Sequence, residues 1–134
     1  MTQEEKQLLL KDLSARSYYW PKVTPKYGDK AYIYGIKNTN EGLFIIQEIE
    51  EGHDYDIVES IDEFKVYLRP MSSMTEEEDE EWRCYKSSIA ESSDELLGKK
   101  IDELHDWFYR KHIDFRGLIP MGLALEAKEG MYES

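Results

Sequence analysis

The chain has 134 residues, which is long enough for one domain with a substantial core. Hydrophobic residues make up 40% of it and aromatic residues 13%, which is too apolar for intrinsic disorder even though 34% of the residues are charged. With 29 acidic against 17 basic side chains the net charge is −12, which disfavours general attraction to DNA, RNA or an anionic membrane and leaves room for a basic partner.

The first predicted element is a helix over residues 3–16, where leucines recur at helical spacing. Thr2 and Glu5 have the spacing of a capping box, and Pro21 rules out a longer helix. The opening residues are acidic and their apolar run is short, unlike a signal peptide. No stretch approaches the roughly 18 apolar residues of a membrane span, so we expect a cytoplasmic protein.

A series of short strands follows. The segments rich in β-branched and aromatic residues are 30–36, 42–50, 55–59 and 65–68. The turns between the first three contain Asn, Asp and Gly, which suit hairpins. Such a meander predicts either a small antiparallel sheet packed against helices or an SH3-like barrel.

After Pro70 the pattern becomes helical again. Aromatic and aliphatic residues over 82–89 and 101–108 recur at helical spacing, and Gly98 in the segment SSDELLGKK interrupts them. The second helix should end near His112. The apolar tail beyond it should pack onto the core, because its leucines would otherwise stand in water.

These elements predict an α+β fold in a single domain, 1–134. We expect an N-terminal helix in 1–17, a β meander in 18–69, and C-terminal helices with a packed tail in 70–134.

An acidic run begins the first of the two later helices. Thr75 and Glu78 have capping-box spacing, and acids in a first helical turn also meet the positive end of the helix dipole. The run is therefore either a solvated helix start, a patch for a basic partner or a metal site. Its members are Glu76, Glu77, Glu78, Asp79, Glu80 and Glu81.

Residues 16–37 contrast with the rest of the chain. They carry five basic side chains and one acidic, a net of +4, which leaves −16 for the remainder of a chain whose total is −12. This composition fits core and edge strands, a protein- or peptide-binding surface, or a base-stacking surface. The interleaved aromatic residues, which we take as candidate partner-binding residues, are Tyr18, Tyr19, Trp20, Tyr27, Tyr32 and Tyr34.

Catalytic patterns are missing from the sequence. His105 and His112 lie seven positions apart on one predicted helix, about 10 Å, too far for one ion to bind both. Cys84 is the single cysteine, so no internal disulfide can form, and we expect it to be a partly buried structural thiol. Phosphate-binding glycine loops and hydrolase signatures do not occur. We therefore predict no catalytic residue, no metal and no cofactor.

Three segments together resemble a known group of proteins. LLLKDLSAR, VYLRPMSSMTEEE and DFRGLIPMGLALEAKEGMY match, in order and spacing, uncharacterised small proteins encoded by gut anaerobes and their phages or other mobile elements. The resemblance implies no activity and transfers no catalytic residue. It favours a mobile-element accessory protein over a metabolic enzyme.

Three hypotheses for function remain at this point. The first is a non-catalytic module that binds a protein or peptide, without direct contact to nucleic acid or membrane. The second is an acidic mimic of nucleic acid that inhibits a basic protein through the acidic run. The third is an enzyme of unrecognised type.

Overall fold

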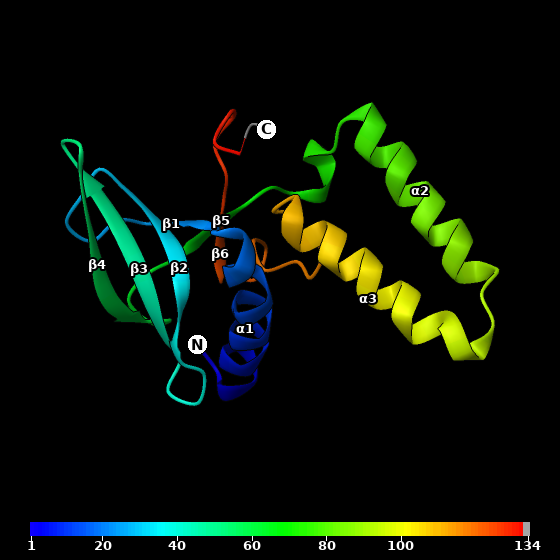
Figure 1. Ribbon diagram of the computed structural model, residues 1–134, viewed down its shortest axis with the longest axis horizontal. Helices are drawn as coiled ribbons and strands as arrows, with labels where there is room; N and C mark the ends of the chain where they lie inside the picture. The colour runs from blue at the N-terminus through cyan, green and yellow to red at the C-terminus, as the bar shows by residue number, and fades with distance from the viewer. Residues whose placement is uncertain (133–134) are drawn as a thin grey trace.

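A computed structural model describes residues 1–132, and Figure 1 shows a sheet, a helix beside it and a pair of helices that project away from it. The helices are α1 (Gln3–Arg16), α2 (Glu76–Ala90) and α3 (Asp94–Arg110), with short 3-10 turns η1 (Ser17–Tyr19) and η2 (Met71–Ser73). The strands are β1 (Lys22–Val23), β2 (Lys30–Asn38), β3 (Leu43–Glu50), β4 (His53–Ser60), β5 (Val66–Leu68) and β6 (Ala124–Glu126). The predicted α+β fold is confirmed.

The strands form one six-stranded sheet in the order β4-β3-β2-β1-β5-β6. All neighbours are antiparallel except β6, which pairs in parallel with β5. The long hairpins β2–β3 and β3–β4 turn where Gly42 and Gly52 take positive φ angles of 67° and 83°. Of the two predicted architectures, the structure has the sheet, with β4 and β6 at its two edges.

Helix α1 covers one face of the sheet. It begins with the predicted capping box, in which the Thr2 hydroxyl accepts from the Glu5 amide and the Glu5 carboxylate accepts from the Thr2 amide. Its buried leucines, Leu9 and Leu13, pack in a core with apolar side chains of β2 and β3. The fully buried members of this core include Ile33, Phe44, Ile46, Leu68 and Leu118.

The pair α2 and α3 forms a projecting helical arm (Figure 1). The base of this arm packs in a second apolar cluster around the buried side chains of Trp107, Phe108 and Ile113. The break between the helices is shorter than predicted, because α3 begins at Asp94 and includes Gly98. A Cβ at this glycine would meet no atom within 4 Å outside its own helix turn. Packing therefore does not require a glycine here.

The tail is packed as predicted. Leu118 and Leu123 are buried in the core, together with Ala124, the first residue of β6. Asp114 organises the turn before β6, since its carboxylate oxygens accept from the amides of Leu118 and Ile119 at 2.8 and 2.9 Å.

Candidate functional site

The face of the sheet opposite α1 is the main candidate surface. Strand register places Tyr32, Gln47 and Asp56 in one cross-strand row of this face. The next row contains Ile45 and Val58. Among residues 1–132, neither apolar cluster includes Tyr32, Ile45 or Val58.

Several large side chains are exposed on or beside this face. Val58 is 51% exposed, and so is Tyr34, which lies in the β-bulge between Ile33 and Gly35. Trp20 is 59% exposed, and its ring lies 6.3 Å from that of Tyr32. We call Trp20, Tyr32, Tyr34, Ile45 and Val58 the open face. Exposed apolar and aromatic side chains gathered on one face are typical of interaction surfaces.

The structure separates the predicted aromatic residues into groups. Trp20, Tyr32 and Tyr34 contribute to the open face. Tyr19 instead turns toward α3 and donates a hydrogen bond to the Asp106 carboxylate, while Tyr18 is 81% exposed and packs edge-on against Tyr19.

Tyr27 belongs to the other side of the sheet, in the loop between β1 and β2. Glu48, which is buried on the core face of β3, accepts hydrogen bonds from the amides of Lys26, Tyr27 and Gly28. Burial raises the pKa of Glu48, but these three bonds outweigh it and lower the pKa overall. The loop is thereby held against β3.

Half of the acidic run makes contacts with other side chains of the protein. Glu78 is buried, completes the capping box with Thr75, and accepts two bonds from the Arg69 guanidinium, at 2.6 and 2.9 Å. Arg69 lowers the pKa of Glu78 to about 2. Glu81 accepts a bond from the Trp107 indole at 2.9 Å.

The rest of the run lies on the surface of α2. Asp79 makes an i,i+4 ion pair with Arg83 at 2.9 Å. Glu76, Glu77 and Glu80 are exposed, and no ion pair involves them within residues 1–132. Three carboxylates therefore remain for a basic partner.

Another carboxylate, on the edge strand β4, is buried without a hydrogen-bond partner among residues 1–132. Glu59 on β4 is 1% exposed, and neither of its carboxylate oxygens makes a hydrogen bond within the described chain. Burial raises its pKa. A buried ionised carboxylate without hydrogen-bond partners is costly, and this cost is the main cause of the raised pKa of Glu59.

The histidines and the cysteine stay apart. His105 stacks on Phe115 with ring centroids 4.8 Å apart, and His112 stacks on Tyr132 at 3.9 Å. In the described chain no three His, Cys, Asp or Glu side chains form a group that could hold a metal ion. The expectation for Cys84 was wrong, because this thiol is exposed on α2.

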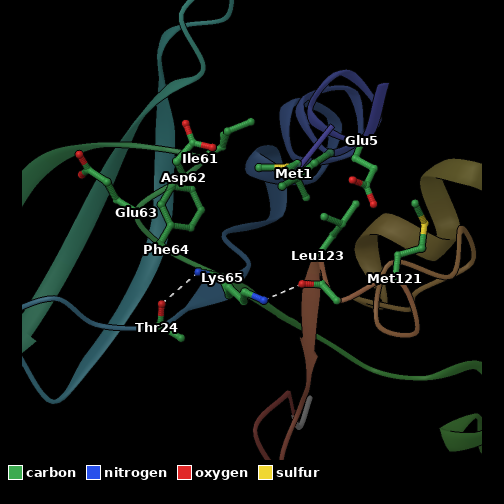
Figure 2. A pocket seen from close by; sticks show the side chains of 12 residues that line it. Met1, Glu5, Thr24, Ile61, Asp62, Glu63, Phe64, Lys65, Met121 and Leu123 are labelled. Carbon is green, nitrogen blue, oxygen red and sulfur yellow. Dashed lines mark hydrogen bonds between the residues drawn. The ribbon is translucent and has the colours of Figure 1, made fainter. Parts of the chain in front are cut away.

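A cavity of about 610 Å³ lies between α1, the segment 61–65 and the segment 121–123 (Figure 2). Its walls are apolar where Phe64 and Leu123 line it. Lys65 crosses its base, where the backbone amide donates to the Thr24 hydroxyl and the side chain donates to the Gly122 carbonyl. Of the carboxylates that line it, Asp62 and Glu63 pair with Lys6 and Lys26, and Glu5 belongs to the capping box of α1. This arrangement does not indicate catalysis.

Comparison of the chain with protein-family models, with curated proteins and with solved structures finds no match. Within residues 1–132 there is also no helix whose length and apolar character would let it cross a membrane.

Proposed function

We propose that this chain is a non-catalytic binding module that contacts a protein or peptide through its open face. The observation that carries this proposal is the exposure of Trp20, Tyr34 and Val58 on or beside the sheet face opposite α1, whose side chains Tyr32, Ile45 and Val58 belong to neither apolar cluster of residues 1–132. Aromatic side chains on a rigid sheet offer much contact area for little loss of conformational freedom, and they are enriched among residues that dominate binding energy.

The charge around the open face indicates which partner chemistry would complement it. Asp54 and Asp56 are exposed on β4, and register places both on the side of the sheet that carries Ile45 and Ile49. A partner segment with an apolar or aromatic anchor and a neighbouring Lys or Arg would complement this surface. A second copy of the chain fits less well, because each copy carries a net charge of −12.

The resemblance to small phage and mobile-element proteins supports an accessory role of this kind. A nucleic-acid mimic would depend mainly on Glu76, Glu77 and Glu80, since the other carboxylates of the run have partners within the chain. The mimic hypothesis therefore has fewer free charges than the sequence alone indicated.

Site-specific photo-crosslinking in lysate of the native cell tests the proposal. A photo-crosslinking amino acid in place of Val58 should give a discrete protein adduct. The same amino acid in place of Leu96, which is 49% exposed on the helical arm, is the matched control and should not give that adduct. Absence of an adduct at position 58, or the same adduct at both positions, would contradict the proposal. An adduct formed only at the N-terminal end of α2 and lost in high salt would favour the mimic.

A further inference from the structure

A second cavity, of about 470 Å³, lies where the end of α3 meets the start of β1. Its size falls within the range of small-molecule sites. We call it the cationic pocket, and its principal lining residues are Tyr19, Trp20, Lys22, Arg110, Lys111 and His112.

The charge of this pocket is opposite to that of the chain. Its lining contains four basic side chains, and the carboxylate among them, Glu78, is already held by two bonds from Arg69. Lys22, Arg110 and Lys111 form no ion pair within residues 1–132. Lys22 donates instead to the backbone carbonyl of Met131 at 2.5 Å, which is a neutral acceptor.

The pocket also presents aromatic rings. Trp20 is 59% exposed, so a planar ligand could stack on its indole. Also in the lining, the rings of His112 and Tyr132 stack at 3.9 Å with an interplanar angle of 14°. Tyr132 is fixed in place, because its hydroxyl accepts from the Lys22 amide at 2.6 Å and donates to the Tyr67 carbonyl at 2.8 Å.

The backbone is unusual at the same place. Trp20 and His112 have φ angles of 52° and 61°, in the left-handed region that bulky side chains rarely adopt. In the described chain the third such non-glycine residue is Glu51, in the β3–β4 turn. Backbone strain of this kind tends to concentrate at functional sites.

The pKa of His112 reflects its burial and the positive charges around it. Burial, followed by the charges of Arg16, Arg69 and Lys22, lowers the pKa of His112 to about 4. The imidazole is therefore neutral at pH 7. The same positive surroundings would attract an anion.

From the cavity, its three cations without an ion pair in the described chain and its exposed indole, we infer that the cationic pocket binds a small organic phosphate that carries a planar ring, of the nucleoside phosphate class. Lys22, Arg110 and Lys111 would contact the phosphate groups through charge-assisted hydrogen bonds. Trp20 would stack on the ring. A long nucleic acid is a poorer fit, because the remaining acidic surface repels an extended polyanion. The cationic pocket shares Trp20 with the open face but none of the other residues of that face, so variants of Lys111 and of Val58 test the two proposals separately.

Isothermal titration of the full chain with ATP, adenosine and inorganic phosphate, at low and physiological salt, tests it. We expect ATP to bind with a Kd below about 1 mM at low salt. Adenosine and phosphate alone should each bind at least about tenfold more weakly, because each lacks one half of the recognised chemistry. No detectable ATP binding, or phosphate binding as tight as that of ATP, would overturn the inference.

Variants separate the pocket from general charge effects. Lys111→Gln and Trp20→Ala should each weaken ATP binding by at least about tenfold. Lys99→Gln is the matched control for charge, since Lys99 is exposed on the helical arm, and it should leave affinity unchanged. Circular dichroism and melting curves confirm that each variant is folded. Equal losses in Lys111→Gln and Lys99→Gln would mean that the chain's net charge, and not this pocket, sets the affinity.

Discussion

Glu78 and Glu77 are adjacent acids in one run, yet replacing each with Gln should have very different effects. The Glu78 carboxylate is buried, caps α2 and holds Arg69 through two short bonds. Its neighbour Glu77 is exposed. Glu78→Gln removes the charge and leaves the Arg69 guanidinium without its carboxylate, whereas Glu77→Gln removes only a solvated charge.

The magnitude follows from the pKa of Glu78, which falls from an ordinary value of 4.5 to about 2 in the folded protein. That difference corresponds to about 3 kcal/mol of stability at neutral pH. Because the folded-state pKa is lowered, this stability is present above pH 4.5 and is lost as the pH falls from there toward about 2. Glu77→Gln should change stability by less than about 0.5 kcal/mol.

Urea unfolding followed by circular dichroism measures both variants. At pH 7, Glu78→Gln should lose about 3 kcal/mol relative to the parent. As the pH approaches 2 the difference should shrink. Equal effects of Glu78→Gln and Glu77→Gln, or a loss in Glu78→Gln that does not change with pH, would refute the structural role assigned to this carboxylate.

Three further predictions concern substitutions at Asp12, Glu59 and Gly28. Asp12→Ala should cost about 3–5 kcal/mol in urea unfolding, because it strips the fully buried Arg16 guanidinium of the carboxylate 2.6 Å away; a loss below about 1 kcal/mol would contradict this. Glu59→Gln should raise the free energy of unfolding at pH 7, because burial raises the pKa of Glu59 and makes its charge unfavourable there. This gain in stability should vanish below pH 4.5. A destabilised variant at pH 7 would show that the carboxylate has a partner. Gly28→Ala should lower the melting temperature, since a Cβ there would lie 2.6 Å from the Ile49 carbonyl oxygen, and an unchanged value would mean that the loop yields freely.

The local signals in the sequence were sufficient for most elements. The capping boxes at Thr2 and Thr75 mark the starts of α1 and α2, since each depends on residues three positions apart. Alternation along β3 buries Phe44, Ile46 and Glu48 on one face, and the first two belong to the aromatic and β-branched residues that predicted the strand.

Long-range pairing could not be predicted in the same way. Strand β6 is three residues long and joins β5 in parallel, although 55 residues separate the two strands in the chain. The sequence ALE has no strand period, so only tertiary contact defines it.

The candidate sites were only partly predictable. The aromatic and basic character of residues 16–37 pointed to a surface, and three of its aromatics contribute to the open face. Composition could not show that Tyr19 and Trp20 line one cavity with Arg110, the last residue of α3, and with Lys111 after it, about ninety residues later in the chain. The available signals were the net charge of +4 in residues 16–37 and the basic residues at the end of α3. They indicate one site only when the fold brings the two segments together.

Affinity for the partner captured at position 58 is the most direct test of the open face as a binding surface. Tyr34→Ser with Val58→Ser should weaken binding of that purified partner by at least about tenfold and leave the fold intact, because both side chains are already exposed. The matched control is Leu96→Ser with Leu97→Ser, which removes two exposed leucines from α3 and should bind like the parent. If the Tyr34 and Val58 double variant binds as tightly as the parent, the open face is not the binding surface.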